Sequence, residues 1–260
     1  MSELSRKPYD LGDYKGKYVV SASSIDTFFK DTREFLNIIE GKPTFKGNDA
    51  TVLGTLVHYI ASQTIMNKEI NKEDMFDFYC ENSEYVTYGD ILDKAFEISE
   101  TLIPYIKNNI YSYKFCEDRF KYQISDNLML CGTTDLVVGD ELIDFKTTRD
   151  QKKINTFPEN YISQLSTYIY LLRKNNIEIN RFALIWITVP NTNRVSDKTG
   201  KRLKEYPTQI NKISMEVNDE VLDNIEKKIN LIKDSIELSI SNPEYKHIIF
   251  KDYDLKEIVF

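Results

Sequence analysis

Two aspartates and a lysine near the middle of the chain have the types and spacing that phosphodiester chemistry uses. Asp135 ends the run GTTD (132–135), and Asp144 precedes Lys146 by two positions in DFKT (144–147). Side chains at i and i+2 of a strand point to the same face, so Asp144 and Lys146 lie side by side. Carboxylates are ligands for Mg²⁺ or Mn²⁺. A neighbouring lysine can orient the attacking water or stabilise charge at a phosphate. The pattern therefore predicts a metal-dependent phosphodiester site.

A structural salt bridge between Asp144 and Lys146 is the alternative interpretation. Asp144 lies inside the apolar stretch LIDF (142–145). An unpaired carboxylate is costly to bury, so Asp144 needs either a cation or a strong partner. Lys146 alone could be that partner. Because a charge inside a strand is more typical of a functional site, the pattern favours a metal.

The elements that must position these residues form one α/β domain with a central mixed β-sheet flanked by helices. Alternation and turn signals predict strands, and a tight Gly139-Asp140 turn joins the strands that carry Asp135 and Asp144. Ile143 and Phe145 then face an apolar core. The expected strands are 115–124, 128–138, 141–147, 182–189 and 213–217. The expected helices are 24–40, 50–66, 158–175 and 218–240. Residues 1–20 read as an extended lead-in to a domain at 21–260, with a mostly helical insertion at about 70–112.

Composition and charge narrow the class of protein. The 260 residues are 41% hydrophobic and 29% charged, as in a soluble globular domain with one core. Three cysteines without paired spacing, no apolar run of membrane-spanning length and no signal-peptide layout predict a cytoplasmic protein. The net charge of −7 argues against a basic protein that coats DNA.

A basic cluster lies in the turn-rich loop at about 190–208. Such a loop is either a phosphate-binding hairpin tip that contacts DNA or an ordinary solvated loop. Its basic residues are Arg194, Lys198, Lys201, Arg202 and Lys204.

The spacing of Asp135, Asp144 and Lys146 resembles the PD-(D/E)xK nuclease motif, and other segments agree in order. GTLVH (54–58) is similar to the Gly-x-x-x-His helix of the RecB-like branch of that superfamily. QLSTY (164–168) is similar to its Gln-x-x-x-Tyr helix, and SASSIDTF (21–28) to its serine-rich helix start. The resemblance implies a restriction-endonuclease-like fold over residues 21 to 170.

The same resemblance assigns roles around the site. It implies that Mg²⁺ or Mn²⁺ is held by His58, Asp135, Asp144 and the backbone carbonyl of Phe145. Glu117, on the preceding strand, is a further acid that this branch often carries there, or simply an exposed strand acid. His58 could instead be an ordinary helix residue.

Lys146 would act with Asp135 and Asp144 on the attacking water or the developing phosphate charge. Gln164 and Tyr168 share one helix face. Their expected role is to position the lysine or a phosphate, and ordinary helix packing is the alternative.

The chain also departs from many RecB-like nucleases. Where those carry the first of four cluster cysteines, this chain reads KDTR (30–33), so no iron–sulfur cluster is expected. No phosphate-binding loop of a helicase motor is present in the sequence. The resemblance therefore suggests a stand-alone domain of a phage-like replication, recombination or repair module, with a helicase or recombination protein as a partner.

The function expected from these observations is a metal-dependent DNA nuclease, and an exonuclease rather than an endonuclease. Its substrate would be linear single- or double-stranded DNA. Two alternatives remain: a non-catalytic nucleic-acid- or protein-binding module on the same fold, and a nuclease that acts on RNA.

Overall fold

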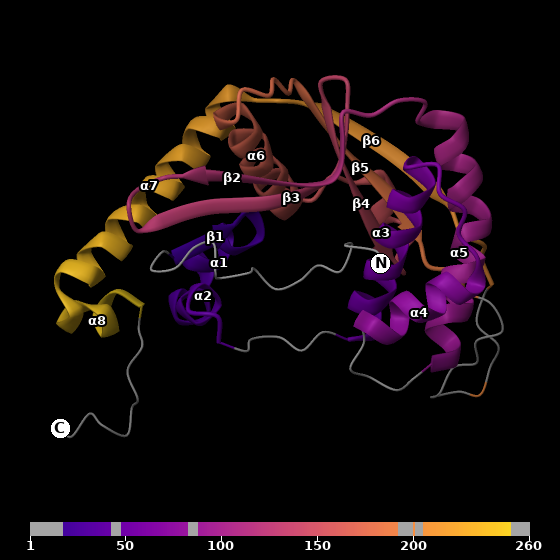
Figure 1. Ribbon diagram of the computed structural model, residues 1–260, viewed down its shortest axis with the longest axis horizontal. Coiled ribbons are helices and arrows are strands. Elements are labelled where there is room, and N and C mark those ends of the chain that lie inside the picture. Colours follow the sequence, from indigo (N-terminus) through magenta and orange to yellow (C-terminus); the bar gives the residue numbers. More distant parts are fainter. Residues whose placement is uncertain (1–17, 43–47, 83–87, 192–199, 201–204, 251–260) are drawn as a thin grey trace.

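The computed structural model describes residues 18–42, 48–82, 88–191, 200 and 205–250. Its centre is a six-stranded sheet in the order β1-β3-β4-β5-β6, with β2 paired to the other side of β3 (Figure 1). The strands are β1 (Tyr18–Ser21), β2 (Phe115–Gln123), β3 (Leu128–Val138), β4 (Glu141–Thr148), β5 (Arg181–Thr188) and β6 (Ile210–Glu216).

Helices flank this sheet and pack against it through apolar contacts. They are α1 (Ala22–Lys30), α2 (Thr32–Ile39), α3 (Asp49–Ile65), α4 (Lys72–Asn82), α5 (Tyr88–Asn109), α6 (Glu159–Lys174), α7 (Asp219–Ser241) and α8 (Lys246–Phe250). Short 3₁₀ turns, η2 (Lys153–Asn155) and η3 (Pro243–Tyr245), precede α6 and α8.

The sheet is mixed, which confirms the predicted α/β fold. β1 pairs with β3 and β4 with β5 in parallel, whereas the β2–β3, β3–β4 and β5–β6 pairs are antiparallel. A parallel pair needs a crossover, and α6 supplies it between β4 and β5. Both β1 and β4 pair with β3, so β3 connects β1 to the rest of the sheet.

Alternate residues of the strands enter different cores on the two faces of the sheet. Ile143 and Phe145 pack with α3, α4 and α5 on one face. Leu142 and Trp186 pack with α6 and the start of α7 on the other. The prediction that Ile143 and Phe145 point into an apolar core is confirmed, and α3 is thereby fixed over β4. A third core surrounds β1 and the start of β3 and includes residues of α1, α2, α7 and α8.

Two expectations for the N-terminal part are wrong in detail. Residues 18–20, expected in the lead-in, belong to β1, whose partner is β3. The single helix expected at 24–40 is two helices, because Asp31 adopts an extended conformation between them. The Asp31 carboxylate accepts hydrogen bonds from the backbone N–H groups of Arg33 and Glu34 at 3.1 and 3.0 Å. Asp31 therefore caps α2 instead of continuing α1.

The end of α2 is tied to α8 by charge. Lys246 Nζ donates a hydrogen bond to Glu40, and Lys42 Nζ lies 2.8 Å from the other carboxylate oxygen of Glu40. Burial alone would raise the pKa of Glu40, but the hydrogen bonds and charges of the two lysines outweigh burial and lower the pKa.

Within the described residues, no helix has both the length and the apolar character needed to cross a membrane.

Candidate metal centre

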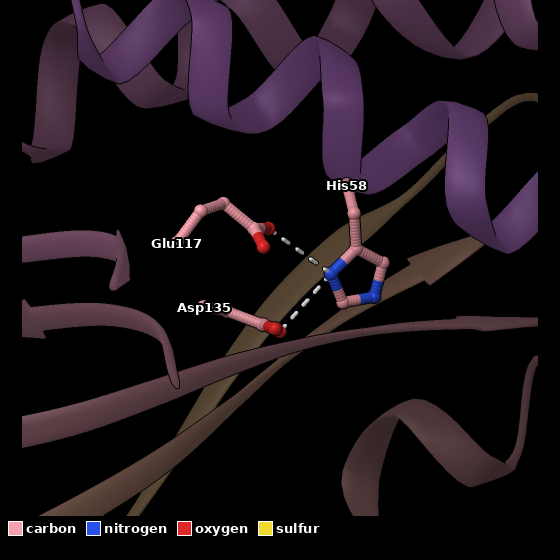
Figure 2. A group of neighbouring side chains, drawn as sticks. All are labelled: His58, Glu117 and Asp135. Carbon is pink, nitrogen blue, oxygen red and sulfur yellow. Dashed lines mark ion pairs between the residues drawn. The ribbon is translucent and has the colours of Figure 1, made fainter. Parts of the chain in front are cut away.

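One imidazole and two carboxylates converge beneath α3. His58 Nδ1 lies 3.1 Å from Asp135 Oδ2 and 3.9 Å from Glu117 Oε1 (Figure 2). One ligand atom from each of the three residues lies within 4.8 Å of the other two. Their side chains are at most 14% exposed. This donor set of one nitrogen and carboxylate oxygens suits a divalent cation such as Mn²⁺ or Mg²⁺.

Asp135 reaches this position because no described strand pairs with β3 on one of its edges at that point. On this edge β1 pairs with residues 128–131 and β4 with residues 136–138, so residues 132–135 lie between the two. Asp135 Oδ2 accepts a hydrogen bond from the backbone N–H of Phe145 at 2.9 Å. The carboxylate thus satisfies a buried donor that a continued strand pair would have satisfied. The separation of β3 from β4 opens the site while Asp135 holds the two strands together.

Glu117 has an unusual backbone conformation. The register pairs Cys116 with Leu136 and Asp118 with Thr134, which leaves Glu117 opposite Asp135 without a regular pair. Its φ of 55° is in the left-handed region, which a glutamate rarely adopts and which costs free energy. Strain of this kind is common where a side chain must be aimed at a site. The sequence left open whether Glu117 is a further acid of the site or an exposed strand acid. The structure places it within the cluster.

Asp144 and Lys146 form an ion pair beside the cluster, as their spacing predicts. Lys146 Nζ lies 2.7 Å from Asp144 Oδ2, and the two side chains are 19% and 8% exposed. Asp144 Oδ2 is buried, and no described residue makes an aligned hydrogen bond with it, so it has room for a cationic partner in addition to Lys146. The sequence placed Asp144 with His58 and Asp135, but the structure leaves Asp144 outside the three-residue group.

The charges in this region act on each other. Burial raises the pKa of Asp144, and the charge of Asp135 adds to this, while Lys146 and His58 oppose it. Burial also tends to lower the pKa of Lys146. The carboxylates of Asp144 and Asp135 outweigh burial, so the pKa of Lys146 is raised.

Helix α6 covers the other face of the sheet and brings Tyr168 against β3. A side chain at Gly132 would place its Cβ 2.5 Å from Tyr168 Cε1, so only glycine fits under the ring. This contact is packing, and it fixes the helix against the strand that carries Asp135. Gln164 is half-buried one turn earlier on the same helix. By contrast, a Cβ at Gly54 would lie an ordinary 3.8 Å from Thr147 Oγ1.

One contact of Lys146 was missed by sequence reasoning, which gave Tyr161 no role at the site. Lys146 Nζ lies 5.1 Å from the centroid of the Tyr161 ring. The only signal in the sequence is that Tyr161 precedes Gln164 by one helical turn, and this spacing alone does not show which strand the ring faces.

The expected DNA-contacting loop lies mostly outside the described residues. Its base is closed by an antiparallel bridge between Asn191 and Tyr206. The five basic residues of the prediction, Arg194, Lys198, Lys201, Arg202 and Lys204, all lie outside the described residues.

Comparisons with known proteins identify the fold. No protein-family model matches the chain, and no curated protein matches it. A candidate exonuclease from Eubacterium rectale is similar over 98% of this chain and 89% of its own, with 15% sequence identity and a TM-score of 0.56. An alkaline exonuclease from Laribacter hongkongensis is 15% identical over 92% of this chain and 96% of its own, with a TM-score of 0.45. A phage-related exonuclease from Haemophilus somnus is 15% identical over 84% and 93%, with a TM-score of 0.39. At 15% identity a structural similarity shows the fold alone. The first similarity, with a TM-score of 0.56, shows that this chain has the fold of the Eubacterium rectale protein.

Proposed function

We propose that the chain is a divalent-metal-dependent nuclease that cleaves linear DNA from its ends. The observation that carries the proposal is the convergence of His58, Glu117 and Asp135 at the open edge of β3, beside the Asp144–Lys146 pair. A purely structural ion pair would not require a buried acid, a partly buried acid and an imidazole nearby. Concentrating these charges is costly unless a cation offsets them.

The residues fit a divalent cation by their chemistry and by the incomplete hydrogen bonding of Asp144 Oδ2. His58, Glu117 and Asp135 would hold it, with Asp144 and the backbone carbonyl of Phe145 as further oxygen donors. When bound, the cation supplies charge stabilisation at the phosphate and lowers the pKa of the attacking water.

The chain's own groups then position the reactants. Lys146 Nζ is placed to donate hydrogen bonds to the attacking water or to a phosphate oxygen as its negative charge increases. Asp135, through its bond to the Phe145 N–H, holds β3 and β4 at a fixed separation. Gln164 and Tyr168 lie on α6, the helix whose Tyr161 contacts Lys146, and we propose that they support the lysine from this same side of the sheet.

The choice of DNA and of cleavage from an end rests on the motif resemblance. The candidate exonuclease with the shared fold supports it. A role in phage-like replication, recombination or repair, alongside a helicase or recombination protein, belongs to the same proposal.

Cleavage of end-labelled linear single-stranded and double-stranded DNA tests the proposal, with closed circular DNA and labelled RNA in parallel. Each substrate is incubated with Mg²⁺, Mn²⁺ or EDTA. We expect metal-dependent loss of linear DNA only, lowered about a hundredfold or more in Lys146→Ala. Lys174→Ala is the matched control, because Lys174 pairs with Glu226 on the surface and should leave the rate unchanged. Cleaved circles would contradict the exonuclease. Absence of cleavage in every arm would contradict the nuclease and favour a binding module.

A further inference from the structure

The ammonium group of Lys146 is held from two sides. Asp144 Oδ2 lies 2.7 Å from Nζ, and the centroid of the Tyr161 ring lies 5.1 Å from it. A cation within about 6 Å of a ring centroid is attracted by the negative face of the ring. The aromatic contact therefore adds a second partner that carries no charge.

The Tyr161 ring has a fixed position that does not depend on Lys146. It packs edge-to-face on Trp186, with ring centroids 5.7 Å apart and an angle of 71°. Trp186 is 2% exposed, and its Nε1 donates a hydrogen bond to the carbonyl oxygen of Thr156 at 2.9 Å. Trp186 is also the register partner of Lys146 on β5. Strands β4 and β5 and helix α6 thus meet at the lysine, and the contact with Trp186 orients the Tyr161 ring.

Asp144 has two competing cationic partners in the proposed enzyme. One is Lys146, and the other is the divalent cation near His58 and Asp135. An oxygen that turns toward a divalent cation interacts less with the ammonium group, which would then be free to move into solvent. Tyr161 has no carboxylate that could turn toward the divalent cation. Its ring therefore remains in contact with Lys146 when Asp144 turns away.

We propose that Tyr161 is a positioning residue that keeps Lys146 at the site when Asp144 turns toward the metal. This inference rests on the proposed function. Removing the negative face of the ring leaves Lys146 either on Asp144, where it opposes the metal, or away from the phosphate. Both outcomes lower turnover, and the first also weakens metal binding.

Replacing the ring by rings of similar shape and different electron density separates positioning from packing. In Tyr161→Phe the face of the ring is kept, and kcat should stay within about twofold of wild type. In Tyr161→trifluorophenylalanine the face is depleted of electron density, and kcat should fall roughly two- to thirtyfold while KM for DNA is unchanged. A ring that only packs would tolerate both substitutions equally.

Tyr170 provides the matched control on the same helix. Its ring lies 5.0 Å from Lys174 Nζ, the same kind of contact but with a lysine outside the proposed site. Tyr170→Phe and Tyr170→trifluorophenylalanine should have the same kcat. A fall in kcat there equal to that at Tyr161 would overturn the proposal.

Calorimetric titration with Mn²⁺ provides a readout that needs no cleavage. The dissociation constant should rise from Tyr161→Phe to Tyr161→trifluorophenylalanine, and this rise should vanish when Lys146→Met is added. If the wild type cleaves DNA but kcat and Mn²⁺ affinity are the same in both variants, the role of Tyr161 is overturned and the nuclease stands. If the wild type is inactive but Mn²⁺ affinity follows the ring, the nuclease is overturned and the positioning role stands. An inactive wild type with unchanged affinities would overturn both.

Discussion

The left-handed backbone at Glu117 predicts that a glycine there stabilises the metal-free protein relative to alanine. Its φ is 55°, and it lies inside β2, two residues after the first residue of the strand. Among the described residues, the other non-glycine residues with positive φ are Asn67 and Asn176, at 56° and 60°. Asparagine tolerates this region, and both follow the end of a helix, where it is common. Glu117 is neither an asparagine nor a residue that follows a helix, so its conformation is held by its surroundings.

The magnitude follows from comparing two substitutions that both remove the carboxylate. An L-residue in the left-handed region costs roughly 1–2 kcal/mol, whereas glycine adopts it freely. Glycine also loses more backbone entropy than alanine on folding, and this loss lowers the advantage of the glycine variant by roughly 0.5–1 kcal/mol. Glu117→Gly should therefore be more stable than Glu117→Ala by about 1 kcal/mol. For a chain of this size the melting temperatures should differ by about 2–4 °C.

Thermal and urea denaturation in EDTA measure this difference. Gln123, exposed near the end of the same strand, is the control because its backbone is regular. There the sign should reverse, with Gln123→Gly less stable than Gln123→Ala by roughly 0.5–1 kcal/mol. If Glu117→Ala is as stable as Glu117→Gly, the strain argument is refuted. With Mn²⁺ added, both Glu117 variants should lose most of the rise in melting temperature that the wild type gains.

Three further predictions concern packing, pH and metal choice. Gly132→Ala should lower the free energy of unfolding in urea by about 1–3 kcal/mol, because its Cβ would overlap the Tyr168 ring. Gly54→Ala should be tolerated, because its Cβ makes only an ordinary contact. Glu40→Gln should destabilise the protein by less than about 1 kcal/mol at neutral pH. Since lysines lower the pKa of Glu40 below its usual 4.5, the difference should persist above that pH and disappear as pH falls through the lowered value. His58→Gln should weaken Mn²⁺ binding by roughly tenfold or more in calorimetry, and Mg²⁺ binding less, because Mn²⁺ accepts nitrogen ligands more readily.

Each of these has a clear contrary result. Equal losses in the two glycine variants would mean that Tyr168 does not press on β3. A stability difference at Glu40 that grows on acidification would reverse the sign of the linkage. Equal weakening of Mn²⁺ and Mg²⁺ binding in His58→Gln would mean that the imidazole nitrogen is not a ligand.

The strands around the site could be predicted because their signals are local. Asp135 and Asp144 lie on a hairpin whose turn, alternation and apolar face are all contained in residues 128–148. The predicted bounds of β3 agree with the structure for this reason. The helix bearing His58 was also predictable from its apolar face. Its convergence with Asp135 was expected only through a family resemblance.

Other features depend on contacts between distant segments. Tyr18, Val19 and Val20 favour a strand, but nothing within residues 18–21 shows that residues 128–131 are the partner. The ring of Tyr161 lies near Lys146 because α6 packs on the sheet with Tyr161 next to Lys146 of β4 and Trp186 of β5. The left-handed conformation of Glu117 arises where β2 passes His58 and Asp135, and a glutamate gives no local sign of it. The break at Asp31 is different, since an aspartate before a new apolar turn is a recognised cap signal that the prediction passed over.

The pairing of β1 with the start of β3 also has a consequence for how the chain assembles. The β2–β3 and β3–β4 hairpins join neighbours in sequence, whereas Tyr18 must find Leu128. Closing the longer loop costs more entropy, so we expect residues 115–148 to become structured before the N-terminal strand docks. Pulsed hydrogen exchange during refolding should protect the amides of β2 to β4 first, and simultaneous protection of β1 would contradict this order. On the ribosome, β1 is synthesised before β3, yet it would be among the last of the described strands to take its place. The two acids of the hairpin would meet each other before the imidazole of His58 reaches them.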